Sequence, residues 1–285
     1  MKNFGEIFRH FRESKNMSLR EVAGRIASAS QISRFERGKT EINVESFYYC
    51  LHTMNISMYE FENKYNEFNH ISNVMYNTNF PEACLERDVS KLKILLENEL
   101  GSDTESSRLN SIIIKIAIFT CDSSKRVQKS DIEYLSDYLF SIDSWNKYET
   151  WLFCNSIPVI PFKTLEVLGN EFMSNIHIHK QNANYNKEIY ITLLNIANYF
   201  LERDNLELAL KYIDCIEDLN IPESEMYVRV LYKCTSLIYL YKTGHVTSLL
   251  ELVRITELLD SINCSNSSKK IKRYLSRLQI SNKDL

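Results

Sequence analysis

Residues 28–38, which read SASQISRFERG, constrain the fold more than any other stretch of this chain. At 100° per residue, a helix over this stretch turns Ile32 and Phe35 to one side and its hydroxyl and arginine side chains to the other. Ser28 is a suitable N-cap, and Gly38 suits the left-handed position that follows a helix. A helix of about two and a half turns is not stable alone in water. We therefore expect neighbouring helices to cover Ile32 and Phe35.

The flanking sequence supplies such helices. Apolar residues at i, i+3, i+4 and i+7 predict a first amphipathic helix, and a capping box formed by Ser18 and Glu21 begins a second, whose apolar stripe runs to Ile26. Two short helices joined by a tight turn and packed on a first helix form a helix-turn-helix. Two further amphipathic helices complete a domain over residues 1–68. The predicted helices of this domain cover residues 3–15, 18–26, 28–38, 43–54 and 57–68.

Charge is unevenly distributed along the chain. Residues 1–40 contain nine Lys and Arg against four Glu, a local net charge of +5; because the whole chain carries −3, residues 41–285 sum to −8. A basic head on an acidic body is typical of a protein with one end facing phosphate. Together with the helix-turn-helix, this asymmetry predicts that residues 1–68 bind double-stranded promoter DNA.

The polar face of the 28–38 helix is expected to read the bases. Ser30 and Arg34 lie one turn apart on that face, and an arginine there can make bidentate hydrogen bonds to guanine O6 and N7. Side chains near the start of the second helix and after the recognition helix would hold phosphates. The expected DNA contacts are Ser30, Gln31, Ser33, Arg34 and Arg37 near the bases, with Lys15, Ser18, Arg20 and Lys39 on phosphates.

Several of these basic residues have a plainer alternative. We expect Arg12 to pair with Glu36 on the inward side of the domain rather than to contact phosphate. Arg20 is equally well explained as a solvated helix charge. Surface decoration is the alternative for Arg34 and Arg37, although their position on the polar face favours a role in DNA binding.

This part of the chain resembles a known family of regulators. Arg12, the pattern SLxxVA at 18–23 and the pattern ISxxExG at 32–38 look like the Xre, or lambda-repressor, type of helix-turn-helix. More narrowly, SQISRFERG at 30–38 is similar to the head of the Rgg/GadR/MutR regulators. That resemblance implies a cytoplasmic, peptide-responsive transcription regulator of the quorum-sensing type, with a helical repeat domain after the head.

The remainder of the chain predicts a second helical domain, over residues 80–285. Residues 69–79 are polar with little helix signal and are the expected linker. Six Gly and four Pro are few for 285 residues, and strand-like alternation is scarce, so an all-α fold is favoured. Successive helices joined by short turns predict a right-handed α-solenoid of antiparallel pairs. The expected helices cover 88–100, 104–121, 130–142, 144–156, 161–176, 185–203, 206–219, 222–243, 246–262 and 266–278.

One helix pair can be compared with a known repeat. Leu193, Ala197 and Phe200, followed by Ala209 twelve residues beyond Ala197, match the spacing of small and aromatic residues at which tetratricopeptide helices cross. The next pair carries larger residues in the same places. The repeat is therefore degenerate, and we interpret the body as tetratricopeptide-like.

On the tetratricopeptide template, the first helix of each pair lines the concave side of the solenoid. A mainly apolar surface with side-chain amides suits a short hydrophobic peptide in an extended conformation. The alternative for each lining residue is packing against the neighbouring helix pair. The family resemblance adds Asn155 as a polar peptide contact, while Pro158 stands where a basic residue is expected. The expected peptide-binding residues are Asn155, Ile191, Leu194, Asn198, Leu201, Leu231, Cys234, Ile238 and Tyr241.

A single head makes few base contacts, so we expect a homodimer on paired half-sites, with the dimer contact in the helical body. One rival hypothesis keeps the DNA-binding head but replaces the peptide with a small molecule or a protein partner. Another makes the chain an interaction scaffold with an inactive head. An enzyme is disfavoured, and no cofactor or metal is expected, because phosphate loops, metal-ligand spacings and nucleophile motifs are absent from the sequence.

Cysteine usage and hydropathy bear on the compartment. The seven cysteines are scattered without a C-x-x-C pair, which fits free thiols in a reducing environment. The N-terminus lacks a signal-peptide apolar region, and the chain has no apolar run of about 18 residues. We expect a cytoplasmic protein that does not enter a membrane.

Overall fold

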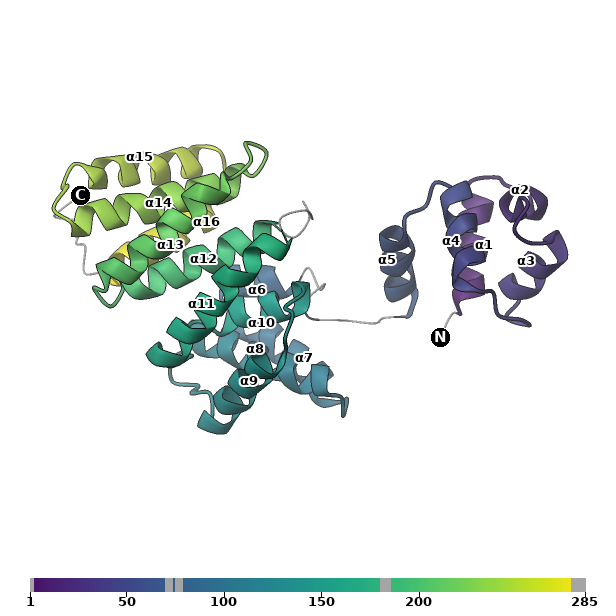
Figure 1. The fold of residues 1–285 in the computed structure, drawn as a ribbon, viewed down its shortest axis with the longest axis horizontal. Coiled ribbons are helices and arrows are strands. Elements are labelled where there is room, and N and C mark those ends of the chain that lie inside the picture. Colours follow the sequence, from purple (N-terminus) through teal and green to yellow (C-terminus); the bar gives the residue numbers. More distant parts are fainter. Residues whose placement is uncertain (1–2, 70–73, 75–78, 180–185, 278–285) are drawn as a thin grey trace. The chain divides into compact units, whose positions relative to one another are not determined.

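The computed structural model describes residues 3–69, 74, 79–179 and 186–277, which are helical apart from their connecting turns and contain no strand (Figure 1). The prediction of an all-α fold is confirmed. The chain divides into two compact units, residues 1–76 and 77–285. Most of the linker expected at 69–79 lies outside the described residues. No described helix is both long and apolar enough to span a bilayer.

Unit 1 is a small helical bundle around one apolar core. The described helices are α1 (Phe4–Ser14), α2 (Leu19–Ala23), α3 (Ala29–Glu36), α4 (Val44–Thr53) and α5 (Met58–Asn69). Helix α3 packs against α1 and α2, α4 packs against α2, and α5 packs against α1. Aromatic rings fill the centre: Phe8 meets Phe35 edge-on at 5.4 Å between centroids, and Phe47 meets Phe61 at 4.9 Å. The helices expected over residues 3–68 are therefore present and share one core.

Helix α1 approaches the end of α3 closely at Gly5. A Cβ atom at this position would lie 2.0 Å from the carbonyl oxygen of Phe35, far inside van der Waals contact. Only glycine allows the two helices to lie this near each other. Gly5 thus allows α3 to pack directly against α1.

The second helix is shorter than its apolar stripe suggests. Helix α2 ends at Ala23, because Gly24 adopts φ +53° and leaves the helical conformation. Glycine is needed there, since a Cβ atom would meet the Tyr49 hydroxyl at 2.6 Å. The expectation that Ile26 continues the buried stripe is wrong, since Ile26 is exposed. The chain turns three residues before the helical period brings Ile26 to the core.

Unit 2 consists of longer helices that alternate in two rows. Helix α8 contacts α10, α10 contacts α12, and α12 contacts α14, so alternate helices form a continuous row. The helices expected in this part of the chain are all present, with shifted ends. They are α6 (Asn79–Glu86), α7 (Val89–Leu100), α8 (Glu105–Cys121), α9 (Lys129–Ser141), α10 (Lys147–Ser156), α11 (Phe162–His179), α12 (Asn186–Leu201), α13 (Leu206–Leu219), α14 (Met226–Lys242), α15 (Ser248–Ser261) and α16 (Ser265–Arg277).

The helix pair α12–α13 has the repeat spacing that the sequence predicts. Leu193, Ala197, Phe200 and Ala209 are all fully buried, and α12 packs along α13. The ring of Phe200 stacks on that of Tyr212 with centroids 5.8 Å apart. Small residues let the two helix backbones approach, and the aromatic pair fills the space beside them.

The C-terminal helix returns to the beginning of unit 2. Helix α16 follows α15, packs on it, and also contacts α6, which lies far away in sequence (Figure 1). The hydroxyl of Tyr274 on α16 donates to the backbone carbonyl of Asn198 on α12 at 2.9 Å. Through these contacts α16 forms a wall opposite the α8–α10–α12–α14 row.

Candidate nucleic-acid interface and ligand cavity

Helix α3 is capped at both ends by its own sequence. The Ser28 hydroxyl accepts the Gln31 backbone N–H at 3.1 Å, which confirms the predicted N-cap. Beyond the C-terminus, Gly38 adopts φ +67° and donates to the Phe35 carbonyl at 2.8 Å, while Lys39 N–H donates to the Arg34 carbonyl at 2.9 Å. This pair of bonds is a Schellman motif. The length of α3 is therefore set by local chemistry.

The two faces of α3 separate as the periodicity predicts. Ile32 is fully buried, and Phe35 and Glu36 are buried at 7% and 5% exposure. The other side chains of the helix that we expect near bases lie at the surface, and Ser33 is half-buried. The exposed ones are Ser30, Gln31, Arg34 and Arg37. This gives α3 a polar, doubly cationic face with an apolar back.

A buried ion pair holds α3 to α1. Arg12 donates from Nε to Glu36 Oε1 at 2.6 Å and from a terminal nitrogen to Glu36 Oε2 at 2.9 Å, and it also donates to the Met17 carbonyl at 2.9 Å. The hydrogen bond to Glu36 raises the pKa of Arg12 above its ordinary value. The prediction that Arg12 faces inward is confirmed, so this arginine belongs to the framework of the head.

The expected phosphate contacts lie at the surface of unit 1. Lys15, Arg20 and Lys39 are exposed, and neither they nor Arg34 and Arg37 form a salt bridge with any described residue. Ser18 is the N-cap of α2: its hydroxyl accepts the Glu21 N–H at 3.2 Å, and its own N–H donates to the Glu21 carboxylate at 2.7 Å. Unpaired surface cations are available to an external anion.

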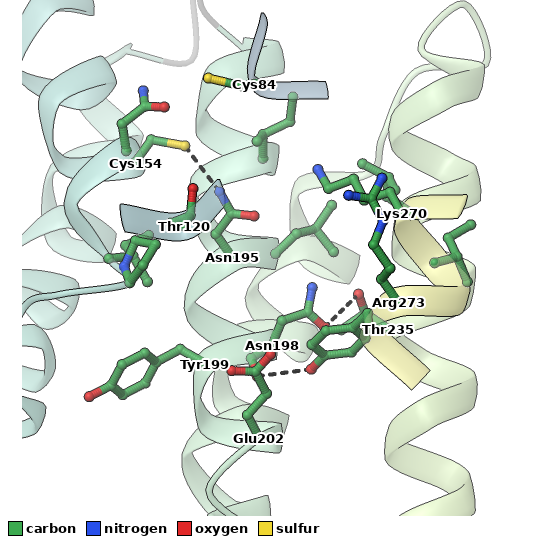
Figure 2. Close-up of a pocket in the computed structure, with 18 of the residues that line it drawn as sticks. Cys84, Thr120, Cys154, Asn195, Asn198, Tyr199, Glu202, Thr235, Lys270 and Arg273 are labelled. Atoms are coloured by element: carbon green, nitrogen blue, oxygen red, sulfur yellow. Dashed lines mark hydrogen bonds between the residues drawn. The ribbon is translucent and has the colours of Figure 1, made fainter. Parts of the chain in front are cut away.

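Unit 2 contains a cavity of about 370 Å³ between the helix row and α16 (Figure 2). Its walls come from α6, α8, the end of α10, α12, α14 and α16. Most of the lining side chains are apolar, with a few amides, hydroxyls, thiols and charges among them. The lining residues include Ile113, Ile116, Ala117, Thr120, Cys154, Ile157, Pro158, Asn195, Tyr199, Thr235 and Ile271, and others are named below.

Most of the residues that the sequence assigns to the groove line this cavity. They are Asn155, Ile191, Leu194, Asn198, Leu231, Cys234 and Ile238. Leu201 and Tyr241 are not among the lining residues. Each lies in the last turn of its helix, one turn beyond a lining residue, and Leu201 has no exposed surface because it packs in the core. The expectation that these two side chains line the groove is corrected accordingly.

The polar groups of the cavity are partly paired with one another. Asn195 Nδ2 donates to the Cys154 thiol at 3.3 Å, and the Thr235 hydroxyl donates to Asn198 Oδ1 at 3.2 Å (Figure 2). Burial raises the pKa of Cys154, and it raises that of Cys234 to about 12. These thiols are therefore neutral near pH 7 and act as apolar wall with weak hydrogen-bonding capacity.

One wall of the cavity was missed by the sequence reasoning. Helix α16 contributes Lys270, Arg273 and Tyr274, and α6 contributes Cys84. The repeat template places only the first helices of pairs on the concave side, so it gives no reason to bring α16 back across them. The available signal was an amphipathic basic helix at 265–277 whose apolar face, with Ile271 and Leu275, needs a partner.

Among the described residues, no group of three or more His, Cys, Asp or Glu side chains is arranged to hold a metal ion. All seven cysteines are free thiols.

Both units of the chain match known protein families. Residues 93–273, more than half of the chain, match the family described as HTH-type transcriptional regulator Rgg, C-terminal domain, and residues 8–61 match a helix-turn-helix family. Among solved structures, the fold is similar to a putative transcriptional regulator from Listeria monocytogenes EGD-e, with a TM-score of 0.78 and 18% identity, covering 98% of this chain and 99% of that one.

A pheromone receptor and a second complex also have similar folds. The SHP pheromone receptor Rgg2 of Streptococcus dysgalactiae aligns with a TM-score of 0.76 and 24% identity over 96% of this chain and 99% of its own. The PrgX/cCF10 complex aligns with a TM-score of 0.66 and 16% identity over 98% and 93%. The extent of the family match decides the assignment: this chain belongs to the Rgg family of helix-turn-helix transcriptional regulators.

Proposed function

We propose that this regulator binds promoter DNA as a homodimer through α3 and that a short hydrophobic peptide in the cavity of unit 2 controls the binding. The observation that carries the proposal is a mostly apolar cavity, lined by side-chain amides that each keep one atom without a described partner, in the unit that matches the Rgg C-terminal domain. Structures similar to this one include a pheromone receptor and a complex with cCF10. The proposal contains no catalytic step, and it assigns the protein to the cytoplasm, where promoter DNA lies.

The DNA contacts follow from the exposed face of α3. Arg34 and Ser30 read base edges, with Gln31, Ser33 and Arg37 beside them. Bidentate arginine–guanine pairing supplies about 1–3 kcal/mol of discrimination against a wrong base. Phosphate contacts position the head without reading sequence. They come from Lys15, Ser18, Arg20 and Lys39.

The ligand contacts follow from the hydrogen-bonding inventory of the cavity. The Nδ2 atoms of Asn155 and Asn195 donate within the protein, at 2.8 Å to the Trp151 carbonyl and 3.3 Å to Cys154. Their Oδ1 atoms accept no hydrogen bond from a described residue. Asn198 is the reverse: its Oδ1 accepts from Thr235, and its Nδ2 has no partner there. Two acceptors and a donor among apolar side chains complement the N–H and C=O groups of an extended peptide.

The volume of the cavity favours one alternative. A cavity of about 370 Å³ falls in the range of pockets that hold small molecules, and an apolar metabolite could pack against the same lining side chains. The DNA-binding half of the proposal is common to both ligands. Calorimetry with hydrophobic peptides and with metabolite extracts distinguishes them.

The proposal is tested by titrating the full-length chain onto the DNA upstream of its own and neighbouring genes at several salt concentrations, with and without peptide. Specific binding should weaken steeply with salt, because each neutralised phosphate contributes about −0.9 to the slope of log K against log salt. Arg34→Ala should lower the preference for the best site by about 1–3 kcal/mol. Arg25→Ala, an exposed arginine outside α3, is the matched control. Equal binding to unrelated DNA, unchanged by Arg34→Ala, would contradict the proposal.

A further inference from the structure

The cationic end of the cavity comes from α16. Lys270 and Arg273 line the cavity and project from α16 toward the side of α12 that carries Asn195 and Asn198 (Figure 2). Neither forms a salt bridge with any residue that the structure describes. Arg273 uses Nε to donate to the Lys269 carbonyl at 3.1 Å, which leaves its terminal nitrogens without a described partner.

Three other lysines near this site are paired with carboxylates. Lys272, on the same helix but outside the cavity lining, pairs with Asp260 at 2.9 Å. On α14, Lys233 pairs with Glu251 at 2.8 Å, and Lys242 pairs with Asp204. Lys270 and Arg273, in contrast, line the cavity and have no salt bridge to a described residue. A face with two adjacent cations and no carboxylate suits an anionic group from outside.

The position of these cations along the cavity can be fixed from neighbouring contacts. The Tyr274 hydroxyl reaches the Asn198 carbonyl, and Lys270 lies one helical turn, about 6 Å, before Tyr274. Lys270 is also close enough to Cys84 and Cys154 that its charge acts against burial on the pKa of both thiols. Since Cys154 bonds to Asn195, Lys270 belongs to the Asn195 end of the cavity.

The opposite end of the cavity carries the opposite charge. Glu202 also lines the cavity and follows Asn195 by seven residues, about 10 Å along the helix direction. An extended peptide spans that distance with about three residues. Side chains of opposite charge therefore line the two ends of the cavity, which gives a bound chain a preferred direction.

We propose that Lys270 and Arg273 bind the carboxylate of the regulatory peptide, with its C-terminal end at the α6–α16 side of the cavity. This inference rests on the proposed peptide-binding function and adds the chemistry and direction of the ligand. The terminal nitrogens of Arg273 donate hydrogen bonds to the carboxylate oxygens, and Lys270 supplies a second positive charge beside them. Both basic residues in the described lining of the cavity, Lys270 and Arg273, belong to α16.

The test uses the full-length chain and three matched libraries of synthetic seven-residue peptides with Leu, Ile, Val, Phe and Ala at every random position. One library has a free C-terminal carboxylate, one is amidated, and one is amidated with Asp as the last residue. Retained peptides are counted by affinity-selection mass spectrometry. We expect about tenfold more retention from the free-acid library than from the uncharged amidated one, since a charge-assisted pair to two cations is lost by amidation.

Variants identify the groups responsible. The double variant Lys270→Gln, Arg273→Gln should abolish the preference for carboxylate, while Lys269→Gln, an exposed lysine on α16 outside the cavity lining, should keep it. Equal thermal midpoints would establish that the variants fold. Retention of the Asp library alone would still support carboxylate binding and would assign the source to a side chain.

Two results overturn the inference, and they differ from each other. Equal retention of free-acid and uncharged amidated peptides, or an unchanged preference in the double variant, overturns the carboxylate site and leaves peptide binding intact. Retention of no peptide from any library overturns the proposed peptide function itself, and the carboxylate site with it.

Discussion

At the scale of single residues, the pair formed by Arg12 and Glu36 joins two helices of unit 1 on the side of α3 that faces inward. Arg12 and Glu36 retain only 13% and 5% of their side-chain exposure, and both Glu36 oxygens accept hydrogen bonds from the guanidinium. Two charges withdrawn from water are stabilising only as long as each has the other. This pair ties the last turn of α3 to α1, behind the arginines that face outward.

Removing one partner of this pair should therefore cost more than removing both. Arg12→Met leaves a buried, unpaired Glu36 and should lower the free energy of unfolding by about 3–5 kcal/mol. The double variant Arg12→Met, Glu36→Met should recover a substantial part of that loss, because no isolated charge remains. Chemical denaturation of the full chain, followed through the transition of unit 1, measures both. A double variant as unstable as the sum of the two single variants would contradict this account.

The thiols give a second prediction at the residue scale. Burial raises the pKa of Cys50 to about 11 and that of Cys84 and Cys234 to about 12, so the thiolate fraction at pH 8 is very small. Cys264 is exposed. Alkylation by iodoacetamide at pH 8 should therefore modify Cys264 first, as read by peptide mass mapping, and Cys50 only on unfolding. Early modification of Cys50 in the folded protein would refute the burial argument.

At the scale of elements, the position of α3 depends on how near α1 can lie. Gly5→Ala would add a Cβ atom 2.0 Å from the Phe35 carbonyl, so the two helices must separate. We expect a loss of about 1–3 kcal/mol in the stability of unit 1, as for other overpacked sites, together with weaker DNA binding. Gly101→Ala is the control, since its nearest neighbour would be an ordinary 3.5 Å away. Similar thermal shifts in both variants would show that the close approach is unimportant.

Elements also mark where sequence reasoning succeeds. The faces and caps of α3 are encoded within eleven residues: Ser28 and Gly38 bound the helix, and the 3.6-residue period decides what it buries. Ile26 was misjudged because the positive φ of Gly24 ends α2 before the period is completed. The repeat template places Leu201 on the concave side, but this last residue of α12 packs in the core. The caps and faces of α3 could be predicted from the local sequence, whereas the ends of α2 and α12 could not.

At the scale of the whole molecule, the cavity exists because the two ends of unit 2 meet. Helix α16 packs on α6, and Tyr274 reaches α12, so residues far apart in sequence share one wall. Helical periodicity gives the apolar face of α16 but not its partner. For this reason the side of the cavity formed by α12 and α14 was predictable, while its cationic side was not.

The proposed homodimer would place two copies of α3 on one DNA molecule. Because the exposed polar face of α3 offers only about two turns of helix, too few contacts for useful specificity, the proposed homodimer would read two half-sites on the same face of the duplex. Inserting five base pairs between the half-sites rotates one of them by about half a helical turn and should weaken binding severely. Inserting ten restores the facing and should recover part of the affinity. Gel-shift titration measures this series, with light scattering to establish the dimer. Equal affinity for all three spacings, or a single chain bound per DNA, would contradict the dimer and leave the reading of bases by α3 intact.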